Sequence, residues 1–269
     1  MSGPDGLDAL DGRVALDGRV ALVTGGSRGV GRAIARRLAA DGAAVAVNYR
    51  RDDAAARETV AAIEADGGKA VAYQAAIGDD ESVRAMTAAV RADLGEVDIL
   101  VSNAGTASRG RSVADTEPDE YLRLMSVHAL GPLALIRTLL PAMRTRPRAD
   151  VVVVSSAITG HAPPFSAPYT MAKAALEAAA RTLAREERSH GIRVNIVAPG
   201  LVATDMGERL VRAVDGRALH DLDARSPFGR VCLPEDVAGV VAFLVSADSG
   251  YVTGQRLVVD GGGPDLGIL

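Results

Sequence analysis

The residues of this sequence best suited to chemistry are Tyr169 and Lys173, which lie four positions apart. On a helix, two such residues share one face, about 6 Å apart along the axis. A nearby ammonium stabilises a phenolate and lowers the tyrosine pKa from its usual value of about 10. Of the 30 Lys and Arg residues only Lys69 and Lys173 are lysines, and the two types are not interchangeable at a shaped site. The pair indicates acid–base chemistry, although an ordinary solvated helix face could have the same spacing.

A glycine-rich turn supplies a second candidate site, between an apolar run at 19–24 and a helical pattern that continues to Ala40. Its sequence is Thr24-Gly25-Gly26-Ser27-Arg28-Gly29-Val30-Gly31. Glycines let the backbone approach a ligand closely, and the free N–H groups and dipole of a helix N-terminus favour an anion. A strand, a glycine turn and a helix in this order predict a diphosphate-binding site, whereas an isolated glycine motif would be weak evidence.

The elements that must position these two sites alternate along the chain. Strands are expected at 44–49, 69–74, 97–102, 151–155, 192–197 and 255–259. Helices are expected at 52–65, near 79–93, within 117–144, from about 167 to 190, and at 234–246. The β-branched run that begins at Val151 is typical of a parallel strand buried on both faces. The alternation predicts an α/β fold: a single doubly wound parallel sheet of Rossmann type, with helices on both faces.

Composition limits the class of protein. With 269 residues, 48% of them hydrophobic and 3% aromatic, the chain can form one large domain with a core of Ala, Val, Leu and Ile. The net charge of −4 implies no general affinity for nucleic acid or anionic membranes. The single cysteine, Cys232, excludes an intrachain disulfide and fits a reducing compartment. The sequence has neither an apolar run of about 18 residues nor a signal-peptide pattern, so we expect a cytoplasmic protein without a membrane partner.

The N-terminal segment contains a repeat, Asp-Gly-Arg-Val-Ala-Leu, at 11–16 and again at 17–22. Only the second copy continues into the glycine turn. We therefore expect 1–18 to be a flexible tail and 19–269 to be a single Rossmann-type domain, without a linker or a second domain.

Across about 19–262 the sequence resembles the short-chain dehydrogenase/reductase family, because several motifs occur in the family's order. They are Thr24-Gly-x-x-x-Gly29-x-Gly31, Ser102-Asn103-Ala104-Gly105, Ser156 thirteen residues before Tyr169, Tyr169-x-x-x-Lys173, Pro199-Gly200, and Thr253-Gly254-Gln255 to Asp260-Gly-Gly. The resemblance is nearest to two groups: reductases of 3-oxoacyl thioesters, such as 3-oxoacyl-(acyl-carrier-protein) reductases, and polyketide ketoreductases. It implies an oxidoreductase domain.

The resemblance assigns a role to each catalytic residue. Tyr169 would be the general acid toward the substrate carbonyl, and Lys173 would lower the Tyr169 pKa and hold the ribose hydroxyls of the cofactor. Ser156 would donate a hydrogen bond to the same carbonyl oxygen. The neighbouring Ser155 is a rival for that role, but the spacing favours Ser156, and we expect Ser155 to be a satisfied hydroxyl at a strand end.

The resemblance also implies the cofactor-binding residues, and no metal is expected. The cofactor set is Thr24, Gly25, Ser27, Arg28, Gly29, Val30, Gly31, Arg50, Ile77, Asn103, Ala104, Gly105, Tyr169, Lys173, Pro199, Gly200, Val202 and Thr204. Within it, 103–105 would line the cofactor with backbone groups, and Thr204 would contact the nicotinamide carboxamide.

Two positions depart from the family pattern. Where the family usually has an Asn that anchors a water relaying protons to the lysine, this sequence has His128. Imidazole could keep the relay with an altered pH response, or His128 could be a core residue without a catalytic part. Where the family usually has an Asp that contacts adenine, this sequence has Ala76; Asp79 or backbone groups could compensate.

Charge favours NADPH as the cofactor. NAD sites place a carboxylate about 20 residues past the glycine motif, but here the second strand ends in Arg50 and Arg51, and Arg28 lies in the glycine turn. Guanidinium groups suit a 2′-phosphate. The alternative is that these arginines face solvent and Asp52 or Asp53 contacts ribose, although both aspartates are better placed to cap the next helix.

The predicted function is NADPH-dependent reduction of a ketone to a secondary alcohol, with a 3-oxoacyl thioester as a candidate substrate. The alternatives are an NAD-linked dehydrogenase of a sugar, steroid or other secondary alcohol, and a non-catalytic dinucleotide-binding protein. The segment 201–228 corresponds to the family's substrate lid, and 161–165 could form an apolar wall. Arg109 and Arg111 could meet an acidic carrier protein or a phosphate, or simply belong to a solvated loop. The alanine-rich helix segment 174–180 and the resemblance imply a homotetramer.

Overall fold

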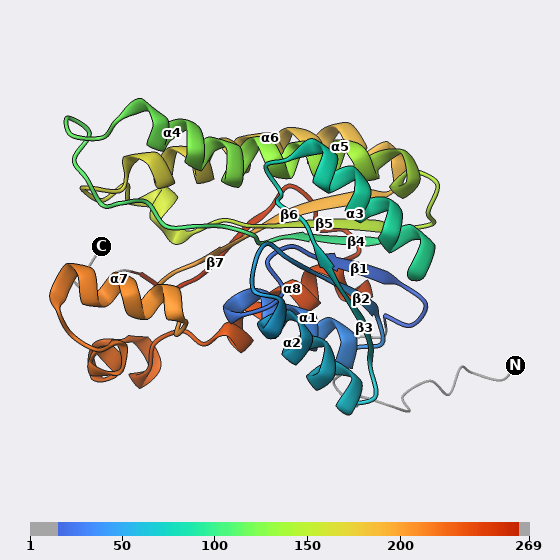
Figure 1. Ribbon diagram of the computed structural model, residues 1–269, viewed down its shortest axis with the longest axis horizontal. Helices are drawn as coiled ribbons and strands as arrows, with labels where there is room; N and C mark the ends of the chain where they lie inside the picture. Colours follow the sequence, from blue (N-terminus) through green and yellow to red (C-terminus); the bar gives the residue numbers. More distant parts are fainter. Residues whose placement is uncertain (1–15, 264–269) are drawn as a thin grey trace, which may run out of the picture.

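The computed structural model of the chain describes residues 16–263. Seven parallel strands form one sheet in the order β3-β2-β1-β4-β5-β6-β7 (Figure 1), so the expected fold class is confirmed. The strands are β1 Val20–Val23, β2 Ala44–Tyr49, β3 Lys69–Gln74, β4 Ile99–Ser102, β5 Ala149–Val154, β6 Ile192–Pro199 and β7 Arg256–Val259. The strand order reverses between β1 and β4, and ligands of open α/β sheets bind at such a switch point.

Helices cover both faces of the sheet. They are α1 Gly29–Ala40, α2 Asp53–Ala65, α3 Asp80–Asp93, α4 Pro118–Met125, α5 Gly131–Met143, α6 Ala167–Glu187, α7 Asp205–Asp215 and α8 Pro234–Val245. Helices α1, α2 and α8 lie on one face, and α3 to α6 lie on the other (Figure 1). Helix α7 extends beyond the carboxyl end of the sheet, followed by short 3-10 turns.

Alternating side chains of the strands enter two cores. In β5, Val151 and Val153 join the core beneath α3 to α6, whereas Val152 and Val154 join the core beneath α1 and α8. All six residues of β5 are buried, because a strand in the middle of a doubly covered sheet has no solvent face. This explains why the strand is a continuous apolar run in the sequence.

The long helix expected within 117–144 is divided by a π-helical turn, Ser126–Leu130. Pro132 follows this turn, and because proline has no N–H it cannot give the α-helical hydrogen bond to the carbonyl of His128. The N–H of the preceding residue, Gly131, bonds to the carbonyl of Ser126, which lies five residues earlier, as in a π-helix. Such π turns often mark functional sites, and here the turn contains His128.

The combined segment Pro118–Met143 is long and apolar enough to cross a membrane by length and composition, and 44% of its apolar window is buried inside the fold. It packs against α3 and α6 on the sheet. A buried core helix of a globular protein passes the same test of length and composition.

The expected boundary between tail and domain needs correction. Leu16 is buried in the core, and its N–H bonds to the carbonyl of Asp41 at the end of α1. The folded domain therefore includes 16–18, because an apolar side chain that fills the gap beside α1 is removed from water. The remainder of the expected tail, 1–15, lies outside the described residues, as does most of the first copy of the repeat.

Candidate active site

Tyr169, Lys173 and Ser156 meet at the carboxyl end of β5. Tyr169 and Lys173 lie one turn apart on α6, and Ser156 follows β5 at the start of a 3-10 turn, Ala157–Gly160. The Ser156 hydroxyl lies near enough to the Tyr169 phenol to lower its pKa. Lys173 Nζ donates to the carbonyl of Val154 at 2.7 Å and lies 5.8 Å from the centre of the Tyr169 ring. The structure thus brings together the three residues expected from their spacing.

The expected lowering of the Tyr169 pKa is wrong for this structure. Burial raises that pKa to about 12 and outweighs the opposite effect of the Ser156 hydrogen bond. Burial also lowers the pKa of Lys173 to about 8, against the raising effect of Glu177. A desolvated ammonium that is bonded to a backbone carbonyl gives the phenolate less support than the helix spacing alone suggested.

Ser155, the rival of Ser156, points elsewhere. Its hydroxyl donates to Glu177 Oε1 at 2.6 Å, and the residue is buried. Ser155 is therefore a satisfied hydroxyl at the end of β5, as expected, and Ser156 is the serine whose hydroxyl contacts the phenol.

His128 lies directly against Tyr169. The two rings meet edge to face, with centroids 5.0 Å apart. His128 Nε2 lies 2.8 Å from the carbonyl oxygen of Thr106, while Nδ1 is buried without a hydrogen-bond partner among the described residues. Burial, assisted by the charge of Lys173, lowers the His128 pKa to about 3, in the expected direction. The imidazole is therefore neutral at physiological pH.

The glycine turn forms a cradle at the switch point of the sheet. A Cβ at Gly31 would lie 2.1 Å from the carbonyl oxygen of Gly25, and Gly25 and Gly29 have φ angles of 63° and 52°. Glycine is thus required both for close packing and for the left-handed backbone. Helix α1 starts at Gly29 without a side-chain cap, so its N–H groups are available to an anion. This geometry fits a dinucleotide diphosphate.

Hydrogen bonds connect the glycine turn to the end of β4. The Thr24 hydroxyl accepts bonds from the N–H groups of Asn103 and Ala104, both at 2.9 Å, and Asn103 Nδ2 donates to the Thr24 carbonyl. Gly105 packs against the His128 ring so closely that an added Cβ would lie 2.7 Å from Cε1. Residues 103–105 thus connect the glycine turn to the ring of His128.

The end of β2 has exposed arginines and engaged aspartates. Arg28 and Arg50 are exposed, and Arg28 lies 3.9 Å from Asp52. Asp52 caps α2 by accepting the N–H of Ala55, as expected, and Asp53 accepts the hydroxyl of Tyr49. Both carboxylates are thus occupied within the protein.

At Ala76, where the family pattern has an aspartate, the described structure places no carboxylate of the neighbouring residues in its stead. The Ala76 N–H bonds to Ser82 Oγ, and Asp79 caps α3 through the N–H of Glu81. Asp79 is thus engaged at the helix start. Ile77, also expected near the cofactor, is buried in the core.

The remaining predicted cofactor residues follow β6. Gly200 bonds through its N–H to the carbonyl of Val259, and Val202 is buried and bridges to Cys232. Thr204 caps α7, and its methyl group lies 3.2 Å from the position of a Cβ on Gly29. The start of the expected lid segment thus lies beside the glycine turn.

On the substrate side, Arg109 is already in contact with an acidic residue. Its N–H donates to the buried Glu120 at 2.6 Å, and its Nε lies 3.9 Å from the same carboxylate. Arg111 is exposed. In the expected wall, Phe165 is largely exposed, and both Ala162 and Phe165 have positive φ angles.

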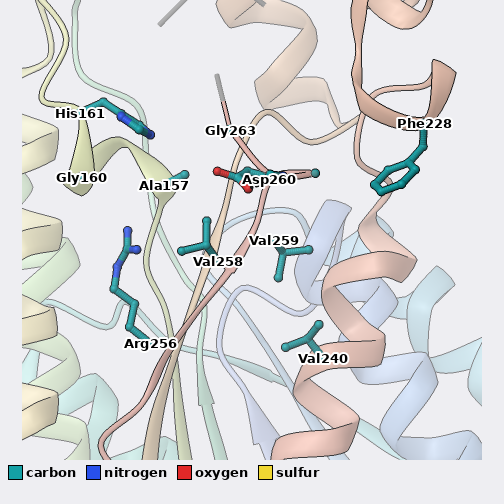
Figure 2. Close-up of a pocket in the computed structure, with 12 residues that line it drawn as sticks. Ala157, Gly160, His161, Phe228, Val240, Arg256, Val258, Val259, Asp260 and Gly263 are labelled. Atoms are coloured by element: carbon teal, nitrogen blue, oxygen red, sulfur yellow. Dashed lines mark hydrogen bonds between the residues drawn. The ribbon is translucent and has the colours of Figure 1, made fainter. Parts of the chain in front are cut away.

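A pocket of about 820 Å³ lies between β7 and the turn of Ala157 and Gly160 (Figure 2). Its lining includes Ala157, His161, Arg256, Val258 and Asp260, and excludes Tyr169 and Lys173. This pocket therefore does not contain the Tyr169–Lys173 pair. Among the described residues, no cluster of three His, Cys, Asp or Glu side chains could hold a metal.

Two residues near the site escaped the sequence analysis: Glu177 and Arg256. Glu177 lies one turn after Lys173 on α6, and Arg256 Nε lies 3.1 Å from both of its carboxylate oxygens. The sequence did contain a signal for Glu177, because it is a lone carboxylate in an alanine-rich segment, four residues after Lys173. Its partner lies 79 residues away, and sequence spacing does not reveal such a contact.

Comparisons with known proteins agree with this geometry. A family model described as enoyl-(acyl carrier protein) reductase matches residues 25–263. The chain is 39% identical over 242 residues to 3beta-hydroxysteroid dehydrogenase 1 of Eggerthella lenta, covering 90% of this chain and 92% of that protein. It is 34% identical over 241 residues to the 3-oxoacyl-[acyl-carrier-protein] reductase FabG of Haemophilus influenzae, covering 90% and 96%. A crystal structure of a short chain dehydrogenase from Burkholderia cenocepacia in complex with NADP has a TM-score of 0.82 at 36% identity, covering 92% and 98%.

Proposed function

Because the chain belongs to the short-chain dehydrogenase/reductase family, we propose that this oxidoreductase reduces a ketone to a secondary alcohol with NADPH. The observation that carries the proposal is the contact of Ser156 with Tyr169, one helical turn from Lys173. A non-catalytic binding protein would have no need of this arrangement.

The protein side of the reaction follows from the pKa values. With a pKa of about 12, Tyr169 keeps its proton at neutral pH and can give it to the carbonyl oxygen of the substrate. The Ser156 hydroxyl donates to the same oxygen as its negative charge develops. Lys173 is cationic below about pH 8, so its charge stabilises the phenolate that Tyr169 becomes. The bound dinucleotide supplies the hydride.

The residues at the cradle support NADPH over NADH. The two nearest carboxylates, Asp52 and Asp53, are engaged with α2 and Tyr49, while Arg28 and Arg50 are exposed beside the glycine turn. These exposed guanidinium groups favour the additional phosphate of NADPH. The relative of known structure that binds NADP is consistent with this choice.

The function is tested by NADPH oxidation with a panel of ketones that includes a 3-oxoacyl thioester, a cyclic aromatic ketone and a steroid ketone. We expect turnover with at least one member, and none with the Tyr169→Phe protein. Absence of turnover across the panel, with tight NADPH binding, would favour a dinucleotide-binding protein without this activity.

A second candidate is an NAD-linked dehydrogenase of a steroid or other secondary alcohol. The hydroxysteroid dehydrogenase among the relatives favours it, at 39% identity over 90% of the chain. The engagement of Arg109 with Glu120 also leaves fewer free cations for an acyl carrier or its phosphate. NAD reduction with 3-hydroxysteroids, compared with NADPH oxidation by the matching ketones, distinguishes the two.

The assembly that we propose is a cytoplasmic homotetramer. Ala174 and Ala178 are exposed on α6, one turn apart, and such small side chains allow close approach of a second helix. Light scattering at micromolar concentration should give four times the chain mass of 27.7 kDa. A mass of one chain would contradict the assembly.

A further inference from the structure

A largely buried ion pair packs against the turn that begins at Ser156. Glu177 and Arg256 form it, with side chains 5% and 23% exposed. Glu177 Oε1 also accepts the hydroxyls of Ser155 and Thr159, at 2.6 and 2.8 Å. The pair is thus fully engaged with the residues on either side of Ser156, and the proposed catalytic steps make no use of it.

The Glu177–Arg256 pair joins three elements. Glu177 belongs to α6, which carries Tyr169 and Lys173, and Arg256 is the first residue of β7. Arg256 Nη2 donates to the Ser156 carbonyl at 3.2 Å and to Thr159 Oγ1 at 2.8 Å. Figure 2 shows the Arg256 side chain extending from β7 toward the segment of Ala157 and Gly160.

The hydrogen bonds between the Ser156 hydroxyl and the backbone are longer than those that Arg256 gives to the same turn. Its Oγ lies 3.5 Å from the Pro199 carbonyl and 3.4 Å from the N–H of Ile158, near the limit for hydrogen bonds. Its main-chain carbonyl, in contrast, accepts a charge-assisted bond from Arg256 Nη2 at 3.2 Å. The position of the hydroxyl is therefore set mainly through the backbone of its own turn.

We propose that Glu177 and Arg256 are positioning residues, which hold the Ser156 turn against α6 so that the serine hydroxyl meets the Tyr169 phenol. This inference rests on the proposed ketoreductase function. Displacement of a catalytic group by about 1 Å reduces rates by roughly a hundredfold. Removing Arg256 would abolish its bonds to the Ser156 carbonyl and to Thr159 Oγ1. Removing Glu177 would leave the partly buried Arg256 without its carboxylate.

Glu177 has a second effect, because it lies one turn from Lys173 and raises the pKa of that lysine against burial. Lys173 also faces Tyr169 and His128. Glu177 itself faces Arg256 of β7, and Arg181 of α6 at 3.5 Å. Neutralising Glu177 should therefore shift Lys173 deprotonation to lower pH, an effect that a purely structural role would not produce.

The test compares Glu177→Gln and Arg256→Met with Arg181→Gln. The control removes an arginine that pairs with the same carboxylate but is 45% exposed and belongs to α6 alone. We expect kcat for the best ketone to fall by about tenfold to a hundredfold in the first two variants, with the Kd of NADPH changed by less than about threefold. In Glu177→Gln the alkaline limb of the pH–rate profile should move to lower pH. Arg181→Gln should match the unmodified enzyme.

Crystal structures of the unmodified protein and Arg256→Met give a readout that does not depend on turnover. A displaced Ser156 hydroxyl in the variant supports the proposal. An unmoved hydroxyl, or variants that lose thermal stability while the folded protein keeps its kcat and pH profile, would overturn it. If the unmodified enzyme reduces no ketone, the ketoreductase proposal fails, and the Ser156 displacement still decides the positioning proposal.

Discussion

His128 meets Tyr169 edge to face, with ring planes inclined at 78° and centroids 5.0 Å apart. The ring that replaces the usual asparagine of the family therefore contacts Tyr169, the proposed general acid. If Nε2 donates to the Thr106 carbonyl, the buried Nδ1 is left as an acceptor that could hold a water. We propose that His128 takes part in a proton relay through this acceptor.

With a His128 pKa of about 3, the imidazole stays neutral across the working range. We therefore predict that kcat is flat between about pH 5 and 7, without an acid limb from this residue. His128→Asn should retain kcat within about threefold, whereas His128→Ala should lower it by about tenfold or more at unchanged cofactor affinity. Equal kcat and equal pH profiles in all three proteins would make His128 a packing residue.

The same pKa predicts a pH dependence of stability. His128 binds its proton less readily when folded, with a pKa of about 3 against the ordinary value of about 6.5. The unfolded chain therefore binds more protons between these values, and the free energy of unfolding falls as the pH is lowered through this range. Urea unfolding between pH 4 and 7 should show a weaker dependence in His128→Asn. A parallel dependence in both proteins would contradict the buried neutral imidazole.

Tyr169→Phe should abolish ketone reduction, because the phenol is the proton donor, while NADPH binding persists. General acids contribute about 10²- to 10⁴-fold. In the unmodified enzyme, the rate should fall above about pH 8, where Lys173 loses its proton. The matched control is Tyr251→Phe, which removes a fully exposed phenol. Activity of Tyr169→Phe within about tenfold of the unmodified enzyme would exclude Tyr169 as the acid.

NADPH should be preferred over NADH by about tenfold or more in kcat/KM, a difference of about 1.4 kcal/mol. Arg28→Ala and Arg50→Ala should each reduce this ratio of kcat/KM values, because a guanidinium that pairs with the 2′-phosphate of NADPH has no such partner in NADH. Arg36→Ala, an exposed arginine on α1 that pairs with Asp66, is the control. Equal use of both cofactors by the unmodified protein would refute the preference.

Asp150 should be a stability determinant remote from the site. It is buried near the start of β5 and pairs with Arg19 at 2.7 Å, Arg148 at 3.2 Å and Arg193. Asp150→Asn leaves these cations without their carboxylate, and breaking a buried pair costs about 3–5 kcal/mol. Asp66→Asn, which breaks the exposed pair with Arg36, should cost at most about 1 kcal/mol. Denaturant unfolding of both variants measures the difference.

The sequence by itself determined the sheet, the glycine cradle and the position of Tyr169 one helical turn from Lys173. Unbroken apolar strands such as β5, separated by helical repeats, leave few arrangements other than a doubly covered parallel sheet. Likewise Gly25, Gly29 and Gly31 are recognisable because each is close in sequence to the others. The Tyr169–Lys173 pair is recognisable for the same reason, since one helical turn fixes their relative position.

Tertiary structure decided what depends on contacts between distant segments. The sign of the Tyr169 pKa shift is one case, because burial raises this pKa and outweighs the opposite effect of Ser156. The contact of Arg256 with the Ser156 carbonyl is another, since 100 residues separate them. The burial of Leu16 beside α1 is a third. Desolvation and long-range hydrogen bonds are properties of the packed molecule, whereas periodicity and spacing are properties of the chain.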